Sequence, residues 1–303
     1  MMSKARILKV ATQELFQRIG GVPLLYYCGY PNFGDVLGRD IFSALSPCGV
    51  YRPLTQRGPH LIFLGSLLTQ ANAHSVVLGS GFIKEVDPIS VDAAYFVRGE
   101  YSKKMLNPKR SPRQGVSLAD AVQVLAYPPL LKKISDFYRA KAALKLGAYG
   151  ERRIVVLHHI TFSKIFGDGR CTASAGNQFV ISTGAPVEVL FEWIRGADAI
   201  ASDALHPLIL ADTLMVPNKW ISVDEATDLL GGDYKFFDYA SQRPGDPYRK
   251  HGVPLDELID CGSSLFDGAT VRSFTGDGAY LAACVLDAIN GLRSRSYDSI
   301  YLV

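Results

Sequence analysis

The feature that most constrains the fold is a unit that recurs along the chain: a short apolar strand, a polar corner and then a helix. It is most complete at 197–220, where an expected buried strand is followed by a polar corner and then by an apolar helical run. The same alternation occurs on both sides of residue 150, and it is typical of parallel sheets covered by helices on both faces. We therefore predict an α/β fold with two doubly wound, Rossmann-like domains, residues 1–150 and 151–303, that face a common cleft.

Apolar periodicity and turn residues set the expected elements. The expected strands are 22–28, 61–66, 76–81, 93–97, 154–157 and 179–182, and the expected helices are 33–45, 129–146, 187–195 and 278–292. The small and polar residues of 161–177 predict a loop over the cleft. The last helix is expected to cross back to the first domain.

The polar corner around His206 is the strongest candidate for a ligand site. Pro207 is favoured at the first position of a helix, where its missing N–H costs nothing, and this would place His206 at the cap. The amides that follow, including that of Leu208, would then face a phosphate or carboxylate. The alternative is that Ser202 or Asp203 caps the helix and His206 is a buried structural histidine.

Composition narrows the function classes. The chain has 303 residues, 48% of them hydrophobic and 20% charged, which is typical of a soluble globular enzyme. A net charge of +3 with scattered basic residues argues against nucleic acid but allows a small anionic ligand. Five distant cysteines indicate reduced thiols in a cytoplasmic protein, without zinc or other metal-ligand spacing. A helix at 5–19 would lie on its own domain or on the inner face of a membrane as a peripheral contact.

Several common catalytic signatures are missing from the sequence. It has no nucleotide-binding glycine loop, no zinc-protease motif, no hydrolase nucleophile elbow and no Asp-x-Asp pair. What remains is a set of polar residues at predicted strand ends, which converge on one cleft in parallel sheets. These residues are Asn32, Asp35, Ser66, Ser80, Arg98, His158, His159 and His206. Asn32 and Asp35 also have the spacing of a helix cap and its third helical residue, which alone would explain both.

Five short motifs occur in an order that resembles the polysaccharide pyruvyl transferases, over roughly residues 20–240. They are Asn32-x-Gly34-Asp35, two strand tips ending in Gly-Ser, Val97-Arg98-Gly99, Ser202-x-x-Leu205-His206 with Ala211 and Pro217 behind it, and Lys235-Phe236-x-Asp238-Tyr239. The resemblance implies transfer of the enolpyruvyl carbons of phosphoenolpyruvate onto a sugar as a ketal, with release of phosphate. It also implies a fold like that of the two-domain (GT-B-like) glycosyltransferases, and a bacterial surface or exopolysaccharide precursor as acceptor, free or lipid-linked.

The resemblance implies roles for the candidate residues. The donor would bind at Arg98, His206, Leu208, Ser80 and Lys235, on the side of residues 151–303, and the acceptor at Asn32, Asp35 and Ser66, on the side of residues 1–150. Proton transfer would fall to Asp35, His158 and His159, and stabilisation of the departing phosphate to His206. No cofactor and no metal are expected.

The sequence also departs from the family pattern. Pro207 stands where glycine is usual, Asp203 and Ala204 stand where serine or arginine is common, and Ala119-Asp120-Ala121 replaces a Gly-Asp-Pro segment. Asp203 would place a negative charge near the anion site. Two other functions therefore stay open: a glycosyltransferase that uses a nucleotide sugar, and a carbohydrate-binding relative without activity.

Overall fold

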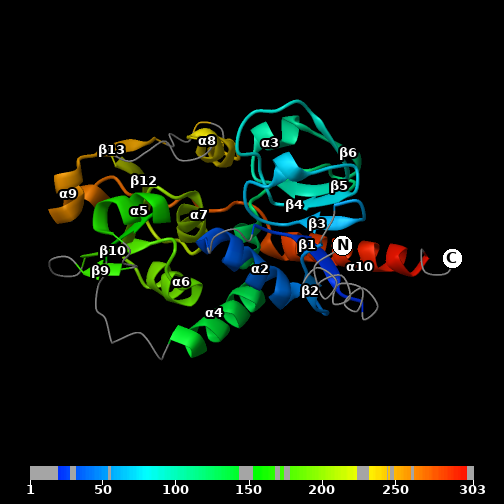
Figure 1. Ribbon diagram of the computed structural model, residues 1–303, viewed down its shortest axis with the longest axis horizontal. Helices are drawn as coiled ribbons and strands as arrows, with labels where there is room; N and C mark the ends of the chain where they lie inside the picture. The colour runs from blue at the N-terminus through cyan, green and yellow to red at the C-terminus, as the bar shows by residue number, and fades with distance from the viewer. Residues whose placement is uncertain are drawn as a thin grey trace, which may run out of the picture.

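The computed structural model describes residues 20–27, 32–53, 56–142, 153–167, 171–173, 178–223, 232–243, 245, 249–260 and 263–298. Over these ranges the chain is an α/β protein with two sheets of mainly parallel strands, each accompanied by helices (Figure 1). The helix expected at 5–19 and the boundary expected near residue 150 lie outside the described residues.

The first sheet is built from residues 22–118. Its spatial order is β2 (Val50–Tyr51), β1 (Val22–Leu25), β3 (His60–Ile62), β4 (Ser75–Leu78), β5 (Ile89–Val97) and β6 (Leu106–Arg110), with β7 (Ser117–Leu118) also paired to β5. The described pairings in it are parallel. Its associated helices are α2 (Phe33–Leu45), α3 (Glu100–Lys104), α4 (Pro128–Ala142) and the 3-10 turns η1 (Leu68–Gln70) and η2 (Ala121–Ala126).

The second sheet is built from residues 153–253. Its spatial order is β13 (His251–Val253), β12 (Asn218–Val223), β11 (Ala199–Ser202), β8 (Arg153–Leu157), β10 (Gln178–Ser182) and β9 (Cys171–Ala173), and β9 runs antiparallel to its neighbour. Its helices are α5 (His159–Phe166), α6 (Val187–Arg195), α7 (Leu205–Thr213), α8 (Tyr234–Ala240), α9 (Leu255–Asp260) and the turn η3 (Ser263–Phe266). The final helix, α10 (Gly278–Asp298), returns to the first sheet, where it packs on η2, α2, β1 and β4 (Figure 1).

Each sheet has a point at which its strand order reverses. In the first sheet the chain passes from β1 to β2 on one side and then to β3 on the other, so the reversal lies between β1 and β3. In the second sheet it lies between β8 and β11 for the same reason. Connections leave such a point toward opposite faces, which opens a crevice at the carboxyl ends of the two strands, where ligands of α/β proteins bind.

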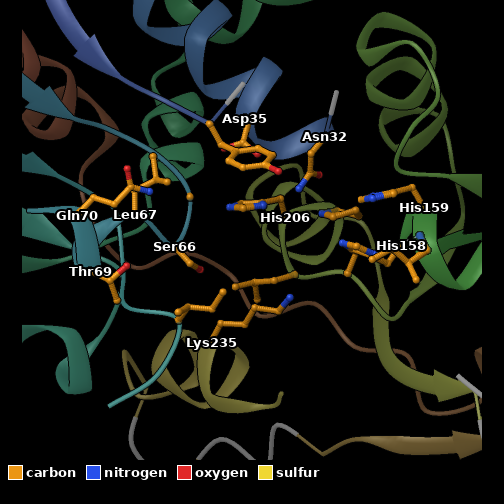
Figure 2. A pocket seen from close by; sticks show the side chains of 17 residues that line it. Asn32, Asp35, Ser66, Leu67, Thr69, Gln70, His158, His159, His206 and Lys235 are labelled. Atoms are coloured by element: carbon orange, nitrogen blue, oxygen red, sulfur yellow. Dashed lines mark hydrogen bonds between the residues drawn. The ribbon is translucent and has the colours of Figure 1, made fainter. Parts of the chain in front are cut away.

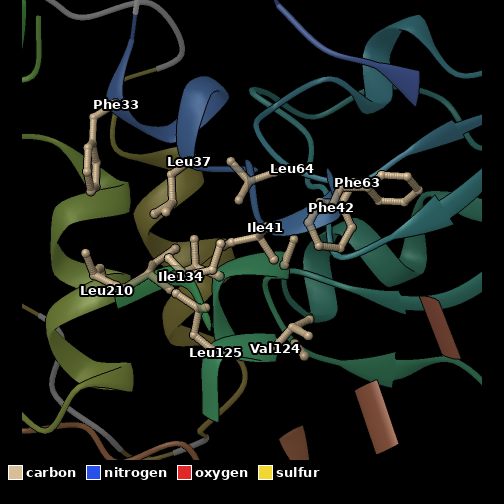
Figure 3. Packing of buried hydrophobic residues seen from close by; sticks show 14 of the residues in the cluster. Phe33, Leu37, Ile41, Phe42, Phe63, Leu64, Val124, Leu125, Ile134 and Leu210 are labelled. Atoms are coloured by element: carbon tan, nitrogen blue, oxygen red, sulfur yellow. The ribbon is translucent and has the colours of Figure 1, made fainter. Parts of the chain in front are cut away.

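One continuous hydrophobic core joins the two sheets. Helix α2 places Leu37 and Ile41 beside Ile134 of α4, and Leu210 of α7 belongs to the same buried cluster (Figure 3). All four side chains are almost completely shielded from solvent. Burial of one such side chain contributes about 1.5–3 kcal/mol, so the helices between the sheets hold them in a fixed relation.

Most predicted elements are present, and two predictions are wrong. Helices α2 and α6 begin and end at the predicted residues. The loop expected at 161–177 is in its first part helix α5, because Phe162, Ile165 and Phe166 pack on the core of the second sheet. Helix α7 begins at Leu205, two residues before Pro207. Proline is tolerated there because the first-turn N–H groups have no helical partner.

None of the described helices is both long enough and apolar enough to cross a bilayer.

Candidate functional site

A cavity of about 410 Å³ lies where the reversal points of the two sheets meet. Its walls come from the segments that follow β1, β3, β8 and β11, together with the start of α8 (Figure 2). Seven of the ten predicted site residues line it: Asn32, Asp35, Ser66, His158, His159, His206 and Lys235. The remaining three, Ser80, Arg98 and Leu208, do not line it. The convergence of strand ends thus brings together residues that are 203 positions apart in the chain, from Asn32 to Lys235.

His206 stands at the centre of the cavity, on the first turn of α7 (Figure 2). Its imidazole lies directly on the backbone of Gly34, where an added Cβ would lie 2.6 Å from the ring atom Cγ. Its Nε2 atom is shielded from solvent and has no hydrogen-bond partner among the described residues. Buried polar atoms are normally paired, so this nitrogen is a candidate for binding a ligand. The alternative of a satisfied structural histidine does not fit that geometry.

The start of α2 forms the wall above His206. Asn32 is the N-cap residue by position, but its side chain makes no capping hydrogen bond, so the capping interpretation does not explain it. The main-chain N–H of Phe33 donates to the carbonyl of Thr183 at 3.1 Å, which ties this helix start to the end of β10. Burial raises the pKa of Asp35 to about 7, although a hydrogen bond from the backbone of Tyr27 opposes the shift. Near neutral pH this carboxyl group therefore carries a proton for much of the time.

His158 and His159 enter the cavity from the end of β8, with their rings 4.3 Å apart (Figure 2). The backbone N–H of His158 donates to Asp203 Oδ1 at 2.5 Å, and that of His159 donates to Thr183 Oγ1 at 3.0 Å. Asp203 is only 5% exposed, and burial raises its pKa to about 6. Its carboxylate holds the β8 corner in place, and with a pKa of about 6 it is still mostly ionised at neutral pH, so it places a negative charge near Lys235.

The prediction that Arg98 binds the ligand directly is wrong in this geometry. Its guanidinium is fully buried, pairs with Asp238 Oδ2 of α8 at 3.0 Å, and donates to Ser66 Oγ at 2.9 Å and to the carbonyl of Phe82. The side chain fills the space over Gly81, where a Cβ would collide with it. Arg98 therefore positions Ser66 on one wall of the cavity and α8 on another, and it contributes positive charge from behind.

Ser80 and Leu208 also act behind the cavity. Ser80 is fully buried and donates to the carbonyl of Gly65 at 2.8 Å, which shapes the loop that carries Ser66. Leu208 is fully buried in the core because α7 starts earlier than predicted. In the first turn of α7, Leu205, His206 and Pro207 line the cavity, and Leu208 does not. Asp120, in the segment that departs from the family pattern, caps the turn η2.

Among the described residues that line the cavity, Lys235 is the only lysine or arginine. Burial and the charge of Arg98 lower the pKa of Lys235 to about 8, so its ammonium is still mostly protonated at neutral pH. Burial, Arg98 and Lys235 lower the pKa of His206 to about 3. The site thus presents one ammonium, neutral imidazoles and the Asp35 carboxyl group, which is protonated for much of the time. The Asp203 carboxylate and the guanidinium of Arg98, paired with Asp238, lie outside this lining. Such a set favours an anion that brings its own negative charge.

Sequence reasoning missed several lining residues. These are mainly Tyr27, Thr69, Gln70, Ile83 and Ile160. Tyr27 and Ile160 are 48% and 43% exposed, and both belong to the cavity wall. Thr69 and Gln70 lie on the turn η1, directly after the predicted Gly-Ser strand tip. Their nearness in sequence to Ser66 was the available signal. Among the described residues no cluster of three or more His, Cys, Asp or Glu side chains is arranged to hold a metal ion.

Comparisons with known proteins give relatives without an assigned function. No family model matches the chain. The uncharacterized protein L143 of Acanthamoeba polyphaga mimivirus is 24% identical over 234 residues, which cover 74% of this chain and 73% of that protein. The solved structure of the uncharacterized protein KP1_0663 from Klebsiella pneumoniae subsp. pneumoniae NTUH-K2044 has 12% identity and a TM-score of 0.39, and the match covers 83% of this chain and 99% of that one.

Proposed function

We propose that this protein is a ketal pyruvyl transferase, which moves the enolpyruvyl carbons of phosphoenolpyruvate onto a sugar of a surface or exopolysaccharide precursor. The observation that carries the proposal is the unpaired Nε2 of His206, buried in a cavity that also receives the ammonium of Lys235. The motifs that resemble the family supply seven of the 17 residues that line the cavity, among them Asp35, His206 and Lys235. We propose further that the sheets are arranged as in two-domain glycosyltransferases, with the acceptor beside the first sheet and the donor beside the second.

The donor carries a phosphate and a carboxylate on adjacent positions, so it needs cationic and hydrogen-bonding partners on one side. Lys235 and the His206 imidazole supply a charge and a neutral donor, and the first-turn amides of α7 add partial positive charge. A bound dianion would raise the pKa of His206, because an opposite charge favours the protonated form. The cavity volume of about 410 Å³ is at the lower end of the range for small-molecule sites, which suits a small donor with one sugar ring.

The reaction needs one acid and one base. Asp35 is the proposed acid, because its raised pKa of about 7 lets it deliver a proton to the methylene carbon of the donor. One of the two adjacent histidines takes the proton of the attacking sugar hydroxyl as the first bond to the central carbon forms. The bond from that carbon to the phosphate oxygen then breaks, and the second hydroxyl closes the ketal. The two sugar hydroxyls lose two protons in all. One restores the proton that Asp35 gave to the methylene carbon, and the other leaves with the phosphate as hydrogen phosphate.

The direct test combines binding and turnover. Phosphoenolpyruvate at a hundred times its dissociation constant should stabilise the protein by about 2.7 kcal/mol, visible as a rise in Tm. Phosphorus NMR should then show phosphate release that depends on an added acceptor, for which methyl glycosides of glucose, galactose and mannose serve as probes. Mass spectrometry of the glycoside identifies the ketal.

The same assay separates the competing functions. Stabilisation by a nucleoside diphosphate in place of phosphoenolpyruvate would contradict the proposal and favour a glycosyltransferase. Stabilisation by glycan alone would favour a binding protein. The variant His206→Ala is the matched control: it should keep the fold and lose the response to phosphoenolpyruvate.

A further inference from the structure

The main chain around His158 fixes its imidazole in one orientation. His158 is the N-cap residue of α5, and its Nδ1 accepts a hydrogen bond from the N–H of Ile160 at 3.4 Å. Its own N–H donates to Asp203 Oδ1, and its carbonyl accepts from the N–H of Phe162 at 2.9 Å. The backbone of His158 is therefore held by two hydrogen bonds and its ring by one, at Nδ1, which leaves the Nε2 edge of the imidazole for the cavity that the residue lines.

The cap hydrogen bond determines which ring nitrogen carries the proton. Because Nδ1 is the acceptor, the neutral ring of His158 must hold its proton on Nε2. A second proton on Nδ1 would face the N–H groups of the first turn of α5, where the helix carries partial positive charge. The neutral form with Nε2–H is thus the form that the fold accommodates.

Two of the groups that face His158, His159 and Lys235, also disfavour a second proton on its ring. His159 of α5 lies 4.3 Å away ring to ring, and Lys235 of α8 contributes a positive charge from across the cavity. With burial as the largest cause, these neighbours lower the pKa of His158 to about 3. Asp203, at the corner after β11, is the adjacent carboxylate, and its Oδ1 is engaged by the main chain of His158.

We propose that His158 is a fixed neutral hydrogen-bond donor, whose Nε2–H binds an anionic oxygen of the ligand, and that it is not the base of the reaction. The inference rests on the proposed function for the identity of that oxygen, which belongs to the phosphate or carboxylate of the donor, and for the assignment of the base. A neutral imidazole at a helix start is well suited to this role, because it donates without losing a proton. The base is then His159, the other member of the pair.

Two substitutions separate the two nitrogens of the ring. The amide oxygen of His158→Asn replaces Nδ1 and keeps the cap, but this variant lacks the group that reaches the ligand. The amide of His158→Gln extends to the position of Nε2 and keeps a donor there, at the expense of the cap. We expect His158→Asn to retain the Tm and to bind inorganic phosphate about ten- to a hundredfold more weakly. His158→Gln should have a lower Tm and recover most of the phosphate affinity.

Nitrogen NMR of histidine-labelled protein tests the protonation state directly, with the signals assigned by the same variants. From pH 5.5 to 8.5 the His158 signals should stay those of a neutral ring with the proton on Nε2, with and without phosphate. A His158 that titrates in this range, or that carries its proton on Nδ1, would overturn the inference. So would equal phosphate affinity in His158→Asn and the unmodified protein. If these results hold and phosphoenolpyruvate is not turned over, the proposed function fails and the donor role of His158 stands.

Discussion

Replacing Gly34 by alanine probes the contact on which the site is built, that between α2 and His206. The new Cβ would lie 2.6 Å from Cγ and 2.7 Å from Cε1 of the imidazole. The Nδ1 atom of the ring lies closer still. Because carbon atoms at rest are ~3.5–4.0 Å apart, the ring must move by more than about 1 Å or change its rotamer. Overpacking of this kind costs about 1–3 kcal/mol, and the better helix propensity of alanine offsets about 1 kcal/mol. We expect Gly34→Ala to lower the free energy of unfolding by roughly 0–2 kcal/mol.

A double-mutant cycle isolates the contact from other effects of the substitution. In a His206→Ala background the obstacle is gone, and Gly34→Ala should then stabilise the helix by about 0.5–1 kcal/mol. Urea denaturation of the four proteins gives the coupling energy between the two positions, which we expect to be about 1–3 kcal/mol. Strict additivity of the two substitutions would refute the contact.

Ligand binding provides the second readout of the same cycle. A displaced imidazole should weaken phosphate binding about ten- to a hundredfold in Gly34→Ala, because a hydrogen bond to a charged group is lost. Gly38→Ala is the matched control on the same helix: its Cβ would lie 2.6 Å from Cβ of Leu64 in the core, so it should destabilise the protein without changing phosphate affinity. Normal affinity in a folded Gly34→Ala would show that His206 does not bind the anion.

Two further substitutions test the charges around the cavity. Asp238→Asn removes the carboxylate that pairs with the buried Arg98, so it should lower the free energy of unfolding by about 3–5 kcal/mol and weaken phosphate binding. The control Asp233→Asn breaks a surface ion pair with Lys250 and should lower the free energy of unfolding by less than about 1 kcal/mol. Equal urea midpoints for the two variants would contradict the positioning role. The second substitution is at Asp35, whose pKa in the folded protein is raised from 3.8 to about 7. Between these two pH values folding takes up a proton, so the free energy of unfolding falls as the pH rises. Asp35→Asn does not titrate, so between pH 4 and 8 its free energy of unfolding should rise relative to that of the unmodified protein by at most about 4 kcal/mol. A difference between the two proteins that is the same at every pH would count against the raised pKa.

Helix boundaries were predictable where the sequence carries local signals on a strong apolar stripe. Helix α6 starts after Pro186 and ends at Gly196, and α2 starts after Asn32, so propensity and tertiary packing agree there. Helix α5 was missed because the small and polar residues that follow it in the sequence, from Gly167 on, led to one loop being predicted over the whole of 161–177. The pair Phe162 and Phe166, at helical spacing and 5.1 Å apart between ring centroids, was the signal for it.

The membership of the site was more predictable than the orientation of its side chains. Parallel strands end at one edge of a sheet, so strand-end polar residues converge whatever their individual directions. Sequence does not say which of them turn into the cavity and which turn back into the protein. The Arg98 side chain points into the protein because its guanidinium binds Asp238 and the carbonyl of Phe82 there. The missing side chain of Gly81 leaves the space that the guanidinium occupies. That outcome depends on a partner 140 residues away in the chain.

The small residues of the motifs follow from the same packing. Gly34 stands beside Asp35 because His206 from the second sheet must rest on the α2 backbone, and Gly81 follows Ser80 because Arg98 must cross the strand tip. Each glycine therefore marks a place where a functional side chain from elsewhere in the fold approaches the main chain. A larger residue at Gly81 would displace the buried Arg98 from Asp238 and so destabilise the protein, whereas one at Gly34 displaces only the His206 imidazole. Gly34 is therefore the position at which binding is tested with the smaller loss of stability.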